Sequence, residues 1–447
     1  MAGWCKRLVI YVLVPIIAFL VYRRYRAPIQ AISRSLFRNQ ELVDGDEPIV
    51  LWWHQTGSEK FNYYKTCGTN RCYFTENRLH LANNRTKAIL LYGSFTRPYD
   101  LPLPKLPHHE WGLLHDESPK NNYMFSHGEV MELFNHTATF KRESTYPIPT
   151  YWIRSLDWLE SKSFMKTTEE KNKYLTELAP VAYIQSDCDA PSGRDDVVKE
   201  MMKYIKVDSY GKCLHNQELP ESLRDPIKGM MNPEFFEFLS RYKFILAMEN
   251  ALCDDYMTEK LWRPLHVGSV PIVLGSSKVQ DFLPSNSSAI VVNNFKTIKE
   301  LANYIKFLNE NDDEYDKYLS WKHSGVENAR LKEELKTRTY ELPKLGFECH
   351  VCNKIHENKQ RQREGKPEHV FHANKSHYGC PGPVYYKDGD TKFDKNRPFA
   401  YHYYVSKYEA KAIRHFIGLN KTYTDDQYYM YLHQHTKGQL RIVKSEH

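Results

Sequence analysis

The segment from 244 to 276 constrains the fold more than any other part of the sequence, because it predicts one complete βαβ unit. Residues 244–248 form a short apolar run typical of a buried strand, and 270–275 form a second such run. Residues 258–268 have the apolar spacing of a helix and end at Gly268. A strand, helix and strand of about 30 residues matches the length of a parallel crossover. We therefore predict a parallel sheet.

The loop between this strand and this helix is crowded with polar side chains. In parallel sheets, ligands bind outside the carboxyl ends of the strands, close to helix N-termini. The loop therefore predicts a binding site, although an ordinary surface loop has the same kind of composition. The candidate residues are Glu249, Asn250, Asp254, Asp255, Tyr256, Glu259 and Lys260.

Strand-like and helix-like patterns alternate along most of the 447 residues, which indicates an α/β protein with doubly wound parallel sheets. A chain of this length can form two globular domains. We place an N-terminal domain at 46–178, a C-terminal domain at 179–345 and a Cys-, His- and Tyr-rich tail at 346–447, with a helix at 403–419. Strands are predicted at 48–53, 88–93, 111–115, 180–185, 207–211 and 288–293, and helices at 195–205, 234–241 and 297–309.

The N-terminus contains an uninterrupted apolar run at 8–22, with basic residues on both sides. The run is short for a membrane span, for which about 17–25 residues is usual. No small-residue cleavage site follows it, so we favour an uncleaved signal anchor over a cleaved signal peptide. The prediction is a cytoplasmic tail at 1–7, a transmembrane helix at 8–22 and a stem at 23–45. Basic residues on both flanks leave the orientation open.

Five glycosylation sequons bear on the compartment, although their number is only mildly above chance. They begin at Asn84, Asn135, Asn286, Asn374 and Asn420.

Eight cysteines follow Cys5, and an even number is typical of disulfides formed in an oxidising compartment. Cys67 with Cys72, and Cys349 with Cys352, are close enough to pair locally, while other connectivities remain open. A zinc site made of Cys349, Cys352, Cys380 and nearby histidines is the alternative. The disulfide candidates are Cys67, Cys72, Cys188, Cys213, Cys253, Cys349, Cys352 and Cys380.

The net charge of +7 comes from basic residues spread along the chain, without a long basic run outside the N-terminus. This pattern excludes the basic stripe of a nucleic-acid-binding protein. A weak positive bias favours a phosphorylated ligand.

The segment 244–276 also closely resembles the signature of the α1,3-fucosyltransferase family, glycosyltransferase family 10. The matching residues are Glu249-Asn250, Asp255-Tyr256, Thr258-Glu259-Lys260 and Val270-Pro271 through Gly275. The resemblance covers about residues 46–352. It is strongest to the divergent vertebrate branch of fucosyltransferases numbered ten and eleven, through the segments 51–53, 115–123, 185–189, 207–213 and 347–352.

The resemblance implies a GT-B fold, in which two Rossmann-like domains face each other. It also implies an inverting transfer of L-fucose from GDP-fucose to a hydroxyl acceptor. The N-terminal domain would hold the acceptor, and the C-terminal domain would hold GDP-fucose.

The branch resemblance further implies a single-pass type II membrane protein of the endoplasmic reticulum or Golgi, with its catalytic part in the lumen. The favoured acceptor is Ser or Thr of small disulfide-rich EMI-type protein modules. Two alternatives remain: α1,3-fucosylation of GlcNAc on N-glycans, and a catalytically idle sugar-nucleotide-binding protein of the endoplasmic reticulum.

Donor binding is expected to need cations that hold the departing diphosphate. The resemblance assigns this role to Arg194 and Lys260, and Lys260 lies near a helix N-terminus, where anions bind readily. Glu259 and Asn250 would bind the ribose and fucose hydroxyls, Tyr256 would pack beside the nucleotide, and Glu249 would be a further donor-site ligand.

A displacement of this kind also needs a general base. Glu117 is the candidate, because it follows a predicted strand of the first domain and matches the family's catalytic Glu-Ser-Pro. The alternative is a solvent-exposed carboxylate before a proline turn. Arg142 lies where the family has a basic residue, and pairing with Glu143 is an equally good interpretation.

No metal is expected at this site. Asp187-Cys188-Asp189 has the form of the Asp-x-Asp metal motif of another glycosyltransferase class, but in a GT-B enzyme cationic side chains replace the metal. We expect GDP-fucose as the donor substrate and no required cofactor, with a divalent cation at most stimulatory.

Overall fold

The computed structural model describes residues 45–54, 62–225, 232–337, 343–387 and 389–436. The predicted cytoplasmic tail, transmembrane helix and nearly all of the stem lie outside these ranges. Among the described helices, none is both long and apolar enough to span a membrane. The chain divides into two units, Met1–Glu47 and Pro48–His447, and all the described helices and strands lie in the second.

The unit Pro48–His447 contains two large sheets. The second sheet along the chain is parallel throughout and has the strand order β11-β10-β9-β7-β8. It contains the predicted βαβ unit, with α8 connecting β9 to β10. Its strands are β7 (Val181–Ile184), β8 (Val207–Tyr210), β9 (Phe244–Met248), β10 (Val270–Leu274) and β11 (Ile290–Val291), and its covering helices are α5 (Arg194–Met201), α7 (Pro233–Leu239), α8 (Glu259–Val267) and α9 (Ile298–Glu310).

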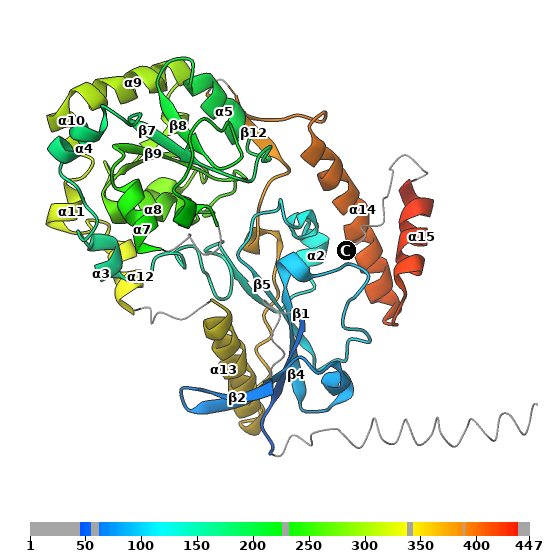
Figure 1. Ribbon diagram of the computed structural model, residues 1–447. Coiled ribbons are helices and arrows are strands. Elements are labelled where there is room, and N and C mark those ends of the chain that lie inside the picture. Colours follow the sequence, from blue (N-terminus) through cyan, green and yellow to red (C-terminus); the bar gives the residue numbers. More distant parts are fainter. Residues whose placement is uncertain (1–44, 55–61, 226–231, 338–342, 388, 437–447) are drawn as a thin grey trace, which may run out of the picture. The chain divides into compact units, whose positions relative to one another are not determined.

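Helices cover both faces of this sheet, with α5 and α9 on one side and α7 and α8 on the other (Figure 1). Alternate residues of each strand enter opposite cores: Leu246 of β9 packs with α5 and α9, whereas Ala247 packs with α8. The predicted α/β fold with parallel sheets is confirmed. The predicted strand at 288–293 is shorter than expected, since a 3-10 turn at Val292–Asn294 replaces its end.

The first sheet has the strand order β2-β3-β1-β4-β5-β6, and all neighbours are parallel except β2 and β3. These two form an antiparallel hairpin that the sequence did not predict, turning at Gly68 with φ of 66°. The segments that connect β4, β5 and β6 contain short helices instead of the longer helices of the second sheet. The elements are β1 (Ile49–His54), β2 (Asn62–Cys67), β3 (Asn70–Thr75), η1 (Arg78–Ala82), β4 (Thr86–Tyr92), η2 (Gly93–Phe95), β5 (Glu110–His115), η3 (Tyr123–Ser126), α2 (Gly128–Met131) and β6 (His136–Thr139).

Short helices lie between β6 and β7 and after α9, and several of them complete the core beneath α8. Trp321 and Leu331 pack there together with Trp262 of α8. The helices are α3 (Leu156–Glu160), α4 (Thr168–Tyr174), α10 (Asp312–Asp316), α11 (Trp321–Ser324) and α12 (Ala329–Thr337).

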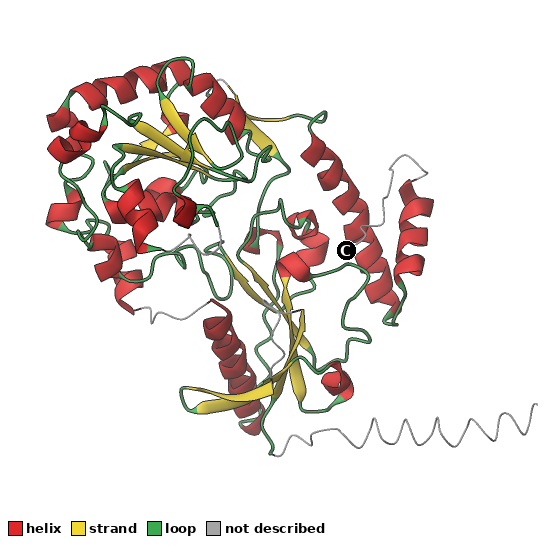
Figure 2. Cartoon of the chain, viewed as in Figure 1, coloured by secondary structure: helices red, strands yellow, loops and turns green. Residues whose placement is uncertain are grey.

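The C-terminal hundred residues, predicted as a Cys-, His- and Tyr-rich tail, pack on both faces of the first sheet. Helix α13 returns to the first sheet and lies beside it (Figure 2). Its residues Phe347 and Val351 pack against Trp52 and Leu90. The opposite face of the same sheet is covered by η3, α2 and later tail residues, including Tyr378 and helix α14. The tail elements are α13 (Pro343–Arg363), η7 (Lys375–His377), β12 (Val384–Lys387), β13 (Asp390–Phe393), α14 (Pro398–Leu419) and α15 (Asp425–Thr436).

All eight cysteines after Cys5 form disulfides in the structure. The local pairs that the sequence left open do not form, because the hairpin cysteines bond instead to α13. The bonds are Cys67–Cys349, Cys72–Cys352, Cys188–Cys213 and Cys253–Cys380. Among the described residues, Cys72, Cys352 and His356 come close enough together to bind a metal, but the two sulfurs are already bonded to each other.

The sequons differ in accessibility. Asn84, Asn286, Asn374 and Asn420 are exposed. Asn135 is only 7% exposed, and its side chain accepts a hydrogen bond from the backbone N–H of Trp111 and donates one to the carbonyl of Phe371. The folded structure therefore argues against the prediction of a glycan at Asn135.

Glu348 of α13 is fully buried, and it is expected to hold this helix to the first sheet. Its carboxylate accepts hydrogen bonds from Trp52 Nε1 at 2.8 Å and from the Tyr63 hydroxyl at 2.7 Å. Glu348→Ala removes the acceptor of the buried Trp52 indole N–H and the bond from the half-buried Tyr63 hydroxyl, which should lower the free energy of unfolding by about 2–4 kcal/mol. Urea unfolding under non-reducing conditions measures this. Glu357→Ala, at an exposed position of the same helix, should change it by less than about 0.5 kcal/mol; equal effects would contradict the prediction.

Candidate functional site

A cavity of about 590 Å³ opens at the carboxyl edge of the second sheet, where the βαβ unit predicted a site. Its walls come from the segments that follow β7 and β8 and from the first turns of α8. Residues that line it include Ser186, Asp187, Lys212, Glu259, Lys260 and Arg263. A space of this volume is typical of small-molecule sites.

The buried carboxylate of Glu249 fixes the start of α8. One of its oxygens accepts hydrogen bonds from the Thr258 backbone N–H at 2.7 Å and from the Thr258 hydroxyl at 2.9 Å. The other lies 3.7 Å from Lys260 Nζ. Burial raises the pKa of Glu249, although Lys260 opposes the shift. In the structure, Glu249 thus binds protein groups at the helix N-terminus rather than lining the cavity.

Lys260 carries its charge into the cavity between two carboxylates. Its Nζ lies 3.2 Å from Glu259 Oε1 and donates to the Thr258 hydroxyl at 3.1 Å. Burial alone would lower the pKa of Lys260, but Glu259 and Glu249 outweigh it and raise the pKa. Burial would raise the pKa of Glu259, yet Lys260 and Arg263 lower it to about 2. The cations therefore stay charged in a partly enclosed site.

Arg194 is a second buried cation beside this site. It is the first residue of α5 and is fully buried, and its guanidinium donates to the backbone carbonyls of Met248 and Asp187 at 3.1 and 2.5 Å. Its Nε–H has no hydrogen-bond partner among the described residues. Its positive charge lowers the pKa of Lys260, against the larger effect of the two carboxylates. A buried guanidinium with an unused donor is suited to binding an anion.

Glu117 follows β5 of the first sheet and faces the same charges. The pKa of Glu117 is raised to about 7, mainly by burial and then by Asp116, while Lys260 lowers it and Glu259 and Glu249 raise it. The charges at the start of α8 thus act on a carboxylate that follows a strand of the first sheet. A carboxyl that titrates near neutral pH is suited to taking a proton.

The two residues before Glu117 point elsewhere. His115 is fully buried and stacks on Tyr378, with ring centroids 5.1 Å apart. Asp116 accepts a hydrogen bond from the Tyr92 hydroxyl at 3.1 Å, and burial raises its pKa. Of these three adjacent residues, Glu117 is the one whose pKa is affected by the charges of α8.

Tyr256 and Asn250 lie outside the cavity lining. Tyr256 is 2% exposed and packs on Phe140 in the core of the first sheet, with ring centroids 5.0 Å apart. Its observed contacts are those of a core residue, unlike the predicted place beside a nucleotide. Within the described part of the chain, the buried side-chain carbonyl of Asn250 has no hydrogen-bond partner, so it is available to a hydroxyl ligand.

An ion pair between the two halves holds the loop before α8. Arg142, which follows β6, lies 2.9 Å from Asp255 and 2.8 Å from Asp281. Asp255 is 1% exposed, and it also accepts the Arg142 backbone N–H at 3.1 Å. The predicted alternative for Arg142, pairing with Glu143, does not form.

The Asp187–Asp189 segment is occupied by protein contacts. Cys188 forms a disulfide with Cys213, and Asp187 pairs with Lys120 and, at 3.4 Å, with Arg194. Sequence reasoning missed Asp187 and Lys212 as cavity residues; their position directly after β7 and β8 was the available signal.

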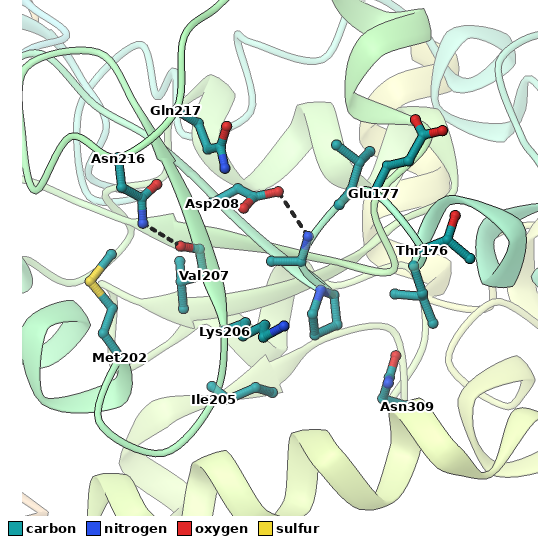
Figure 3. A pocket seen from close by; sticks show the side chains of 14 residues that line it. Thr176, Glu177, Met202, Ile205, Lys206, Val207, Asp208, Asn216, Gln217 and Asn309 are labelled. Atoms are coloured by element: carbon teal, nitrogen blue, oxygen red, sulfur yellow. Dashed lines mark hydrogen bonds between the residues drawn. The ribbon is translucent and has the colours of Figure 1, made fainter.

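A second cavity, of about 510 Å³, lies at the opposite edge of the same sheet, among the residues that precede β7 and β8. Figure 3 shows its side chains bonded to the protein itself: Asp208 accepts the Ala179 backbone N–H at 2.8 Å, and Asn216 donates to the Val207 carbonyl at 2.9 Å. The amino edge of a parallel sheet is not where ligands usually bind, so this cavity is not the candidate site.

Comparison with known proteins bears on the family of the chain. The family model "Glycosyltransferase family 10 (fucosyltransferase) C-term" matches residues 169–368, and "Fucosyltransferase, N-terminal" matches 45–151. A relative from Xenopus laevis named GDP-fucose protein O-fucosyltransferase 3 is 42% identical, covering 86% of this chain and 83% of the relative. The Homo sapiens relative of the same name is 41% identical over 86% of this chain and 82% of its own length.

Among solved structures, an α1,3-fucosyltransferase with GDP-fucose aligns with a TM-score of 0.40 and 17% identity, covering 63% of this chain and 84% of the other. The two family models together match most of the chain, and the full-length relatives exceed 40% identity. The chain therefore belongs to glycosyltransferase family 10, the fucosyltransferases.

Proposed function

We propose that the protein transfers L-fucose from GDP-fucose to a hydroxyl acceptor, with inversion at the anomeric carbon, in a GT-B arrangement of its two sheets. The observation that carries the proposal is Glu117, whose pKa is raised to about 7 opposite the cations of α8. One sheet supplies a base and the other supplies cations, which is the division that a single displacement needs.

In this mechanism the Glu117 carboxylate takes the proton of the acceptor hydroxyl. The acceptor oxygen then forms a bond to the anomeric carbon of fucose, and the bond from that carbon to the β-phosphate oxygen breaks. GDP leaves with the negative charge, which Lys260 and Arg194 stabilise. Glu249 keeps Lys260 at the helix N-terminus through Thr258, where the backbone N–H groups also favour anions.

The favoured acceptor is Ser or Thr of a small disulfide-rich protein module of the EMI type. The name shared by the relatives, GDP-fucose protein O-fucosyltransferase 3, supports a protein acceptor over GlcNAc of an N-glycan. The disulfides support a chain that folds in the secretory pathway. We propose the endoplasmic reticulum or Golgi membrane, with residues 8–22 as a type II anchor, and no required cofactor.

The direct test is incubation of the purified protein with GDP-fucose and either an EMI-type module or an N-glycan bearing terminal GlcNAc. Mass spectrometry follows the added fucose. Transfer to Ser or Thr of the module is the expected result, and transfer to the glycan would select the alternative acceptor. Transfer to neither, with no release of GDP, would overturn the enzyme proposal in favour of a sugar-nucleotide-binding protein.

Glu117→Gln should lower kcat by about 10²–10⁴-fold, because the amide cannot accept the hydroxyl proton. GDP binding measured by calorimetry should stay within twofold of the wild type. Glu129→Gln, at an exposed position on α2, is the matched control and should keep full activity. If Glu117→Gln turns over at the wild-type rate, another group is the base.

The pH dependence of kcat/KM should follow the titration of Glu117. The base works as a carboxylate, and with a pKa of about 7 in the free enzyme it is protonated below that value. The rate constant should therefore fall about tenfold per pH unit below pH 7 and level off above it. Initial rates from pH 5 to 9 measure this; an acid limb near pH 4.5 would mean that the base has an ordinary pKa.

Lys260→Met should raise the dissociation constant of GDP by roughly 10- to 100-fold, because a charge-assisted contact to phosphate is lost. Glu249 and Glu259 would also then repel the diphosphate without an intervening cation. Calorimetric titration with GDP measures the change. Lys173→Met removes an exposed lysine on α4 and should leave the affinity unaltered; a similar loss in both variants would contradict a specific role of Lys260.

A further inference from the structure

The segment 373–387, between α13 and β13, touches several elements that form the proposed site. It lies beyond residue 368, where the match to the family model ends. We call this segment the strap. It contains η7, Tyr378, Cys380 and β12.

The first part of the strap is fixed to the first sheet through β6. The Ala373 backbone N–H donates to the Phe134 carbonyl at 2.9 Å. The His377 carbonyl accepts the Thr139 hydroxyl at 2.5 Å and the Ser144 hydroxyl at 3.0 Å. These bonds hold the strap directly before Tyr378.

Tyr378 connects the strap to the loop that carries the proposed base. Its side chain is fully buried, stacked on His115 and packed against Phe125 and Phe140. Its hydroxyl donates to the backbone carbonyl of Glu117 at 2.9 Å. The carboxylate of Glu117 stays free, because the bond is made to the main chain.

The later part of the strap reaches the donor side. Cys380 is bonded to Cys253, in the loop between β9 and α8. The Tyr386 backbone N–H donates to the carbonyl of Ser192 at 3.1 Å, two residues before Arg194. Between Cys380 and Tyr386, the strap packs on the loop after β9 and on the loop before α5. The cavity among these segments has a volume of about 10 Å³, about the least that a water molecule needs.

We propose that the strap sets the position of the loop bearing Glu117 relative to the donor-binding loops, with Tyr378 as a positioning residue. The proposal rests on the fucosyl transfer proposed above. Glu117 is brought near the α8 cations by two loops from different sheets, and the strap is bonded to both. Displacement of a base by about 1 Å can cost a large part of the rate, so one hydrogen bond to its main chain matters for turnover.

Tyr378→Phe keeps the ring and removes only the hydroxyl. We expect kcat to fall roughly three- to tenfold, the effect of one lost hydrogen bond, while KM for GDP-fucose stays within twofold. The matched control is Tyr315→Phe: Tyr315 is also fully buried and donates to a backbone carbonyl, that of Lys243, at 2.9 Å. Lys243 precedes β9 at the opposite edge of the second sheet, so this variant should lose similar stability and keep kcat.

Hydrogen–deuterium exchange of residues 116–121 gives a readout that does not need activity. Exchange there should rise in Tyr378→Phe and not in Tyr315→Phe. If the wild type transfers fucose and both variants keep kcat, or both lose it equally, the strap proposal is overturned while the proposed function stands. If the wild type transfers no fucose, the proposed function fails, and unchanged exchange at 116–121 in Tyr378→Phe would then also overturn the strap proposal.

Discussion

The site is built around the buried carboxylate of Glu249 at the start of α8. An uncompensated carboxylate at this depth would be costly, and it is compensated by the Thr258 N–H, the Thr258 hydroxyl and the ammonium of Lys260. The same contacts cap the helix and hold a lysine over the cavity. Local folding of the βαβ unit and presentation of a cation to a ligand thus depend on one group of hydrogen bonds.

A single Rossmann-like half would not complete such a site. The second sheet provides cations, and the carboxylate that titrates near neutral pH comes from the first sheet. Contacts between segments distant in the sequence join the halves: Arg142 with Asp255, and the strap with Cys253. Because the interacting groups approach from separate cores, small changes in either core can alter the electrostatics around Glu117.

The sequence predicted the helices and strands that local residue patterns determine. The apolar runs gave β9, α8 and β10 with nearly the observed bounds, since buried parallel strands and a capped helix have strong local signals. The hairpin of β2 and β3 was missed because its first strand is mostly polar and only half-buried. The packing of Tyr256 on Phe140 could not be predicted from local spacing, because it is a contact between distant segments of the chain.

The packing of the tail was still harder to predict from local sequence patterns. Nothing in the local pattern of residues 343–363 indicates that they cover a sheet formed nearly 300 residues earlier, and the cysteine pairs followed that packing rather than sequence proximity. Of the candidate residues on the βαβ unit, Glu259 and Lys260 line the cavity, whereas Tyr378 and the strap had no sequence pattern that points to Glu117.

The return of α13 also has a consequence for biosynthesis. Cys67 and Cys72 are separated from their partners by 282 and 280 residues. At about 5–20 residues per second, translation leaves these two thiols, and one apolar face of the first sheet, without their native partners for on the order of tens of seconds. During that interval the nearest available partner of each thiol is the other. Production of active protein should therefore depend on chaperones, which cover the exposed apolar face, and on thiol–disulfide isomerases. The isomerases keep a non-native bond between Cys67 and Cys72 exchangeable until α13 emerges.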